Sequence, residues 1–302
     1  MTRALSKKAR ANLMLLALAM IWGGCFVAAK IAMESFDAYF IMVLRFFAGS
    51  AALCLLFPKE RKKIDRITVI GASEVSLLMA VSTAFQMEGL KFTTPANQTF
   101  ILVIYVVLVP LIRFIIAGIR PGKHMVVAAI LTVIGVGFLT LGPSLVLNRG
   151  DALSFIMALL FSVEIIRIDH YMPKVQSAIA FTMVQLFVAG LASVVIFFIF
   201  GEGTVIAPVT HKTFLAMGYI VLLNTVVAFY LQNGAQRDAS PEGSALIMST
   251  ESLFGTFAAY FFAGEIFYPK KILGCVLILT GQFVSQALPA IRKINGKRRI
   301  SA

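Results

Sequence analysis

The sequence predicts an all-α polytopic membrane protein with ten transmembrane helices in two inverted five-helix repeats. The first observation is composition: of the 302 residues, 59% are apolar and 14% are charged, and the mean hydropathy is +0.90. Soluble proteins have about 45–50% apolar and about 25% charged residues, so this chain could not cover a water-exposed surface. The second observation is a set of long apolar segments, and the third is a match between the two halves.

Ten segments are long and apolar enough to cross a hydrocarbon core about 30 Å thick, which takes about 20 residues per helix. They lie near residues 12–33, 39–57, 67–87, 95–117, 123–142, 151–171, 179–200, 212–233, 243–263 and 270–289. The first segment exceeds the apolar length of a signal peptide and has no small-residue cleavage pattern. We therefore expect it to be retained as a helix.

Ten spans place both termini on one side of the membrane, and the basic residues indicate which side. With the N-terminus in the cytoplasm, 20 Lys and Arg residues lie inside and five lie outside. The inside residues are Arg3, Lys7, Lys8, Arg10, Lys59, Arg61, Lys62, Lys63, Arg66, Arg113, Arg120, Lys123, Arg167, Lys174, Arg237, Arg292, Lys293, Lys297, Arg298 and Arg299, and the outside ones are Lys91, Arg149, Lys212, Lys270 and Lys271.

Cytoplasmic loops collect Lys and Arg, so this bias predicts a multi-pass protein of the cell inner membrane with both termini in the cytoplasm. The loop 58–66 and the C-terminal segment RKINGKRR are then inside, and the loops 142–150 and 200–211 are outside. The net charge of +13 reflects this topology and contact with anionic lipid, and we expect no nucleic-acid partner.

Two stretches align without gaps at an offset of 146 residues, 93–137 on 239–283. The alignment pairs Pro95 with Pro241 and Gly135 with Gly281. The fourth span runs inward and the ninth runs outward, so the two five-helix halves have inverted topology, as in many secondary transporters. We expect a first repeat in residues 1–142, and a second repeat with a basic cytoplasmic tail in 143–302.

The segment IWGGCFVAAK around Trp22 and the segment NTVVAFYLQNGAQRDASPEGSALIMSTESLFGTFAAYFFAGEIFYPKKILGCVLILTGQ resemble EamA-type permeases of the drug/metabolite transporter superfamily. The resemblance implies a ten-helix transporter with a central cavity between two pseudo-symmetric halves, often one that exports amino acids or related metabolites. The chain departs from symmetry at one position, because the first half carries Tyr105 where the second carries Glu251.

Two carboxylates lie at one depth in the membrane and are candidates for solute binding or coupling. At a rise of 1.5 Å per residue, Glu251 lies about 12 Å and Glu164 about 11 Å from the inner boundary. Charged groups in hydrocarbon are costly and usually face a cavity or a partner. Arg167 follows Glu164 by three residues, so a structural ion pair is the alternative for Glu164. For Glu251, the alternative is a purely structural hydrogen bond to the eighth span.

Four further residues are predicted to contribute to the same site. Trp22 and Tyr105 lie near mid-span, and Asn224 and Gln232 lie on the eighth span. Rings can stack on an apolar or cationic group, and amides can hydrogen-bond either a solute or a neighbouring helix. Arg45, about 9 Å below the outer face, is a candidate gate residue that could pair with Glu34 or Asp37.

Enzymatic functions find little support in the sequence, and we expect no enzyme activity, cofactor or metal site. His124, His170 and His211 lie at span ends without metal-ligand spacing, and no Gly-rich phosphate loop is present. The three cysteines, Cys25, Cys54 and Cys275, fall in apolar segments and are expected to pack there.

The sequence thus predicts a secondary active transporter of small organic solutes, most consistent with export of amino acids or related metabolites by alternating access. Protons are the candidate coupling ion, because burial disfavours the charged form of a carboxylate such as Glu251. The partners are a small-molecule solute and the lipid bilayer, and the chain is expected to be a monomer or homodimer. An uptake permease and a non-transporting membrane sensor or assembly protein with a ligand-binding cavity are the alternatives.

Overall fold

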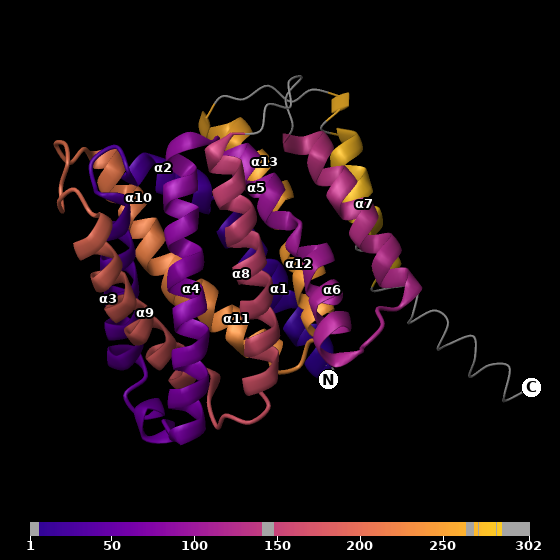
Figure 1. Cartoon of the computed structure of the whole chain (residues 1–302), viewed down its shortest axis with the longest axis horizontal. Helices are drawn as coiled ribbons and strands as arrows, with labels where there is room; N and C mark the ends of the chain where they lie inside the picture. The colour runs from indigo at the N-terminus through magenta and orange to yellow at the C-terminus, as the bar shows by residue number, and fades with distance from the viewer. Residues whose placement is uncertain (1–5, 141–147, 264–268, 271, 282, 286–302) are drawn as a thin grey trace, which may run out of the picture.

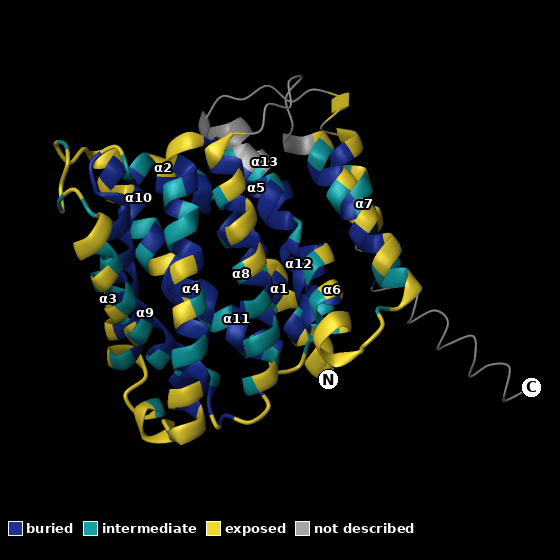
Figure 2. Cartoon of the chain, in the orientation of Figure 1, coloured by how far each residue is buried: buried dark blue, intermediate teal, exposed yellow. Residues whose placement is uncertain are grey.

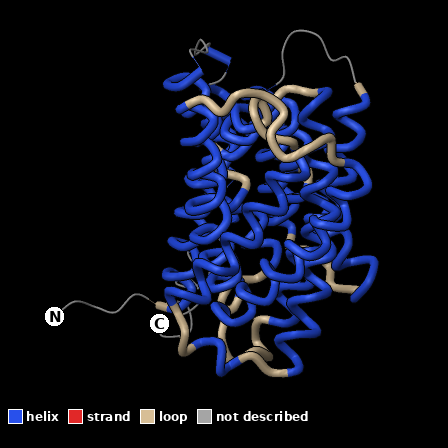
Figure 3. Tube along the Cα trace, turned by 90° about the vertical axis from the view of Figure 1, so that its left-hand side faces the viewer, coloured by secondary structure: helices blue, strands red, loops and turns tan. Residues whose placement is uncertain are grey.

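The computed structural model shows a bundle of helices (Figure 3). It describes residues 6–140, 148–263, 269–270, 272–281 and 283–285. Within this part of the chain there is no strand, and one isolated β-bridge joins Phe36 to Val205. The predicted all-α membrane fold is confirmed.

The helices follow the predicted spans in order (Figure 1). In the first half they are α1 (Lys7–Gly23), α2 (Cys25–Ala32), α3 (Ala38–Leu56), the 3-10 helix η1 (Glu60–Lys63), α4 (Arg66–Phe92), α5 (Pro95–Val103), α6 (Tyr105–Ala117) and α7 (Lys123–Thr140). In the second half they are α8 (Arg149–Tyr171), α9 (Ala178–Phe200), α10 (His211–Val221), the π-helix η2 (Leu222–Val227), α11 (Ala228–Gln236), α12 (Pro241–Met248) and α13 (Glu251–Ala263), followed by an apolar helix at Ile272–Ser285.

Several spans that the sequence predicts as continuous are interrupted. The first breaks at Gly24, the fourth at Ile104, and the ninth between Met248 and Glu251. In the ninth, the hydroxyl groups of Ser249 and Thr250 donate to the carbonyl oxygens of Leu246 and Ile247, at 2.6 and 2.7 Å. Such local bonds compete with the helical backbone pattern, which explains the interruption.

The breaks in the fourth and ninth spans lie at equivalent positions of the two repeats. Helix α6 begins at Tyr105 and α13 begins at Glu251, 146 residues later. Figure 1 shows α5 above α6 but α12 below α13, so the two broken spans run in opposite directions. Interrupted helices at matching places in inverted repeats are typical of transporter binding sites.

The repeat also explains how α7 packs on the last helix. A Cβ atom on Gly135 would lie 2.8 Å from the carbonyl oxygen of Gly274, and one on Gly281 would lie 2.9 Å from that of Ala128. Both positions therefore need glycine for this close approach. The two glycines are the pair that the offset of 146 residues aligned, so each repeat contributes the same contact.

The predicted ranges of the first nine spans agree with the helices to within about three residues except at two ends, and the tenth lies partly outside the described residues. Helix α1 begins at Lys7, five residues before its predicted start at 12. Helix α4 continues to Phe92, five residues beyond its predicted end at 87. The polar residues Gln86 and Glu88 ended the predicted apolar segment, but Lys91 pairs with Glu88 at 2.9 Å and continues the helix. The helix stops before Pro95, which disfavours helical backbone at Thr94.

Exposed residues lie on the outward sides of the helices (Figure 2), and many of them are large and apolar. Within the described residues, six helical stretches are long and apolar enough to cross a membrane. Outward side chains such as Phe198, Leu55 and Ile116 are 82%, 77% and 75% exposed. Exposed apolar surface of this extent suits lipid and not water, so the chain is a multi-pass membrane protein.

The described loops lie in two groups, one at each end of the bundle. We call the end that carries η1 the η1 end, at the bottom of Figure 1; α1 begins there, and the loops 57–65 and 172–177 lie there. The loop 201–210 lies at the opposite end. Most of the loop 142–150 and the C-terminal RKINGKRR segment lie outside the described residues.

Candidate functional site

A cavity lies between the two halves of the bundle, where about 540 Å³ is not occupied by atoms, a volume that includes space open to solvent. It is lined by Trp22, Cys25, Phe26, Arg45, Met79, Ser82, Thr83, Gln86, Leu102, Met157, Phe161, Glu164, Asn224, Phe229 and Glu251. The lining residues come from both halves of the chain. Its walls combine apolar rings and thioethers with a few charged and amide groups, as small-molecule sites do.

Helical periodicity brings the lining residues of α4 to one face. Met79, Ser82, Thr83 and Gln86 follow the i, i+3, i+4, i+7 spacing that defines one stripe of a helix. Gln86 lies six residues before the end of α4, about 9 Å below the end opposite η1. The polar part of α4 therefore faces the cavity and not the lipid.

Arg45 is held at one side of the cavity by the π-helix η2. It is 4% exposed, and its Nε atom donates to Oγ1 of Thr225 at 2.9 Å. Its Nη2 atom donates to the carbonyl oxygen of Asn224 at 3.5 Å. Short π-helical turns are frequent at functional sites, and this one presents polar groups to the guanidinium.

The structure does not pair Arg45 with Glu34 or Asp37, the partners considered from the sequence. Asp37 instead caps α3, accepting from the backbone N–H of Tyr39 and Phe40 at 2.9 and 3.0 Å. Glu34 lies 3.7 Å from Lys212. That pairing hypothesis was wrong because the true neighbours of Arg45 lie about 180 residues away in the chain.

Glu251 begins α13 and is 1% exposed. Its Oε1 atom accepts from the hydroxyl of Tyr105 at 3.5 Å. The two residues are equivalent in the two repeats, so the junctions of both broken spans meet at this bond. Tyr105 and Glu251, where the sequence departs from symmetry, therefore contact each other directly.

Close packing fixes the backbone of Glu251 beside Trp22. A Cβ atom on Gly23 would lie 2.7 Å from the backbone nitrogen of Gly255 and 2.9 Å from the carbonyl oxygen of Glu251. Gly23 therefore has to be glycine for α1 to pack on α13. This contact holds the Trp22 ring at the cavity, 5.7 Å from the ring of Phe161 between centroids.

Glu164 enters the cavity from α8 and is 1% exposed. Its Oε1 atom has no hydrogen-bond partner among the described residues. The structure rules out the predicted alternative of an ion pair with Arg167, because Arg167 contacts Glu74 on α4, with Nε 2.5 Å from Oε1. Arg167 also donates to the hydroxyl of Tyr171 at 3.1 Å.

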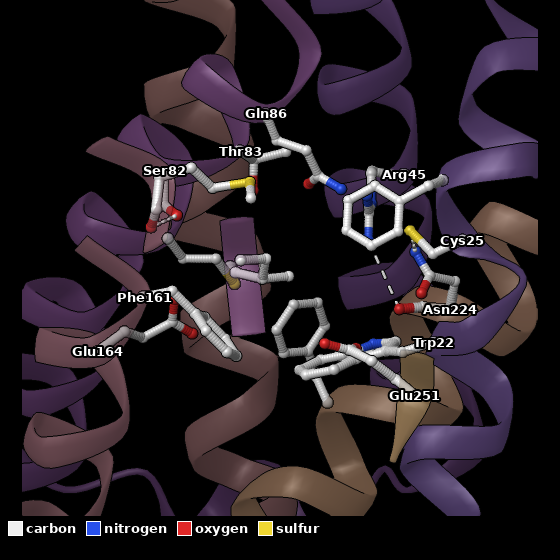
Figure 4. Close-up of a pocket in the computed structure, with 15 residues that line it drawn as sticks. Trp22, Cys25, Arg45, Ser82, Thr83, Gln86, Phe161, Glu164, Asn224 and Glu251 are labelled. Carbon is white, nitrogen blue, oxygen red and sulfur yellow. Dashed lines mark hydrogen bonds between the residues drawn. The ribbon is translucent and has the colours of Figure 1, made fainter. Parts of the chain in front are cut away.

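The cavity therefore holds one cation and two carboxylates that lack ionic partners. None of the ion pairs within 4.0 Å formed by described residues includes Arg45, Glu164 or Glu251. Figure 4 shows Arg45 and Gln86 at one end of the cavity and the two carboxylates at the other. Buried charges need partners, so this arrangement suits a solute with charges of both signs.

The structure brings together five of the seven residues predicted for the site: Trp22, Glu164, Asn224, Glu251 and Arg45. Tyr105 does not line the cavity but contacts Glu251, which does, and its ring packs on that of Phe161 with 5.2 Å between the centroids. Gln232 is fully buried outside the lining.

Sequence reasoning missed several lining residues. Cys25, predicted to pack in a helix, faces the cavity and accepts from Nδ2 of Asn224 at 3.0 Å. Ser82, Thr83 and Gln86 were also missed, although their helical spacing within an apolar span is a signal that could have found them. Among the described residues, no group of three or more His, Cys, Asp or Glu could hold a metal ion.

Comparison with known proteins adds a family and a fold. The EamA-like transporter family matches residues 9–141 and 148–285. An uncharacterized transporter of Archaeoglobus fulgidus shares 30% identity over 273 residues, covering 90% of this chain and 84% of that protein. A second one from the same organism shares 24% over 295 residues, covering 91% and 96%. A protein of known crystal structure has the same fold, with a TM-score of 0.77, 15% identity, and coverage of 92% of this chain and 96% of that chain.

Proposed function

The chain belongs to the EamA-like transporter family, and on this premise we propose that it is a secondary active transporter that exports amino acids or related small metabolites by alternating access. The observation that carries the proposal is the set of unpaired charges of opposite sign in one cavity. A zwitterionic amino acid has the complementary charges. Its carboxylate can accept two parallel bonds from the Arg45 guanidinium, and its ammonium group can bind between Glu251 and Glu164.

The apolar walls of the cavity suit the rest of the solute. Met79, Leu102 and Met157 offer aliphatic and thioether surface, and Trp22 and Phe161 offer ring faces. Such walls hold an apolar or aromatic side chain by burial, and rings also attract an ammonium group. The proposed solute class is therefore an amino acid or related amphipathic metabolite with an apolar part.

Glu251 is the proposed coupling residue. A carboxylate removed from water favours protonation, so a proton and a solute ammonium group would compete for the same charge. Glu251 contacts Tyr105 at the junction of the other broken span, so a change in the charge of Glu251 would alter a contact between the two repeats. Inward movement of protons could then drive outward movement of solute.

We propose the orientation in the membrane that the distribution of Lys and Arg residues predicts. The η1 end faces the cytoplasm of a cell whose inner membrane holds the protein, and both termini lie on that side. The division into repeats at residues 1–142 and 143–302 belongs to the same proposal. Uptake in place of export uses the same cavity, and the direction is set by the gradients.

The test is a panel of radiolabelled amino acids in proteoliposomes, with and without a proton gradient. The proposal predicts saturable flux of at least one zwitterionic solute, accelerated by a gradient that drives protons in the opposite direction. Tight binding without flux under any gradient would contradict it and favour the sensor. Addition of an impermeant thiol reagent to intact cells tests the orientation, since a thiol at position 62 should not react.

A further inference from the structure

Between the cavity and the η1 end lies a second group of buried polar side chains, which we call the inner amide cluster. Its members are Thr182 and Gln185 on α9 and Gln232, Asn233 and Gln236 on α11. All are at most 1% exposed. Gln236 is the last residue of α11 and Thr182 is the fifth of α9, so the cluster lies within about 10 Å of that end.

The inner amide cluster adjoins the cavity directly. Gln185 donates from Nε2 to Sδ of Met79, a lining residue, at 3.5 Å. Gln236 donates from Nε2 to the carbonyl oxygen of Ile165 at 3.1 Å, next to Glu164 in the chain. The cluster thus continues from the carboxylate side of the cavity toward the loops of the η1 end.

Hydrogen bonds within the cluster are incomplete. Asn233 donates from Nδ2 to Thr182 Oγ1 at 2.8 Å and to Gln185 Oε1 at 2.7 Å. Both amide atoms of Gln232, and the amide oxygens of Asn233 and Gln236, have no partner among the described residues. Amides that only hold helices together would be paired, whereas unpaired buried amides call for a state in which they are bonded.

The repeat indicates what that state is. The offset of 146 residues that pairs Pro95 with Pro241 also pairs Gln86 with Gln232, each nine residues before its proline. Gln86 lines the cavity near the end opposite η1, on α4, and Gln232 occupies the equivalent place on α11, toward the η1 end. In inverted repeats the two halves can exchange conformations, so what one glutamine does in one state its partner does in the other.

We propose that the inner amide cluster is the closed inner half of the solute pathway, an uncharged segment that binds water and the polar groups of the solute when the η1 end opens. This inference rests on the proposed transport function. Gln232 is the counterpart of Gln86: one is open to the pathway while the other is buried. The amides carry no charge, so a solute that enters from the η1 end meets hydrogen-bonding groups that do not retain it on its way to the carboxylates.

The test compares thiols placed at positions 86 and 232 by Gln86→Cys and Gln232→Cys, in chains with Cys25, Cys54 and Cys275 replaced by alanine. In membrane vesicles of both orientations, the charged reagent MTSES is applied to one side at a time. We expect position 86 to react from the side opposite η1 and position 232 from the η1 side. Conditions that raise one reactivity, such as a reversed pH gradient, should lower the other.

A matched pair of variants separates the pathway from helix packing. Gln232→Leu removes unpaired amide atoms, and Thr132→Val removes a hydroxyl in α7 that is also buried without a partner among the described residues. Both should fold, with equal or higher Tm. Only Gln232→Leu should reduce amino-acid flux, at least tenfold, while binding in the cavity persists.

Unaltered flux in Gln232→Leu, or a thiol at position 232 that never reacts from the η1 side, would overturn the inference. The accessibility measurement needs no flux. Reciprocal reactivity in a protein that transports no solute would therefore contradict the proposed function but support the inner pathway. Solute flux without reactivity at position 232 would support the proposed function but contradict the inner pathway.

Discussion

Two sets of charged side chains inside this bundle differ in whether they have ionic partners. Near the η1 end, Arg167 pairs with Glu74, and Arg113 pairs with Glu242 at 2.6 Å. The central cavity contains one basic residue, Arg45, and two acidic ones, Glu164 and Glu251. None of the three forms an ion pair within the described part of the chain. The paired set joins helices, and the unpaired set is available to a solute.

The comparison separates two residues that lie three positions apart on α8. Arg167 is partly exposed and forms an ion pair with Glu74, whereas Glu164 is buried and its Oε1 atom has no hydrogen-bond partner among the described residues. Position along the sequence suggested that the two could neutralise each other. The packing of α4 against α8 instead gives Arg167 another partner and leaves Glu164 to the cavity.

The largest effect is expected from Glu251→Gln, which removes a cavity charge and keeps the side-chain shape. We expect normal expression and monodispersity, with solute flux reduced at least a hundredfold or no longer dependent on pH. The measurement is flux in proteoliposomes across a pH series. Wild-type rates with a wild-type pH profile would show that Glu251 is not the coupling residue.

A smaller effect is expected from Arg45→Gln, which removes the cation of the cavity. Hydrogen bonds to charged groups contribute about 1.5–3 kcal/mol, so affinity for a solute carboxylate should fall about tenfold to a hundredfold. Binding of the same solute with its carboxylate converted to an amide should change little. Equal losses for both solutes, measured by calorimetry, would indicate a general packing defect and count against the assigned role.

Breaking a peripheral pair should leave transport intact. In Glu74→Gln the partner Arg167 remains hydrated, because the side chains of Arg167 and Glu74 are 32% and 39% exposed. Exposed pairs contribute about 0.2–1 kcal/mol, so a small fall in Tm and flux within twofold of wild type are expected. A tenfold loss of flux with unchanged Tm would contradict the claim that the paired charges join helices and only the cavity charges serve transport.

The smallest effect concerns Glu60, which ties η1 to the start of α9. Its carboxylate contacts Lys63 at 2.7 Å and accepts from Ser177 at 2.5 Å, and these bonds lower the pKa of Glu60 below its ordinary value. Because the pKa is lowered in the folded protein, the ionised carboxylate stabilises the fold at any pH above the ordinary pKa of Glu. This contribution is lost as the pH falls through the lowered pKa. The fall in Tm caused by Glu60→Gln should therefore be slight at pH 7 and smaller at pH 3; an equal fall at both would contradict the ionic explanation.

Hydropathy predicted the helices well because lipid contact demands long apolar segments whatever the tertiary structure. It could not predict where they break, since Ser249 and Thr250 interrupt the ninth span through local hydroxyl bonds in an otherwise apolar sequence. Helical rise predicted one depth for Glu251 and Glu164, and both residues line the same cavity. The partners of Arg45 could not be predicted, because they depend on how η2 packs on α3.

The central claim is that the unpaired cavity charges recognise a zwitterion, and ligand binding tests it most directly. The amino acid bound most tightly by the wild-type protein is compared with its amide and its N-acetyl derivative by calorimetry. We predict that each modification weakens binding at least tenfold, that Arg45→Gln removes only the penalty of amidation, and that Glu251→Gln removes only that of acetylation. Equal affinities for all three forms, or penalties that survive both substitutions, would contradict the account.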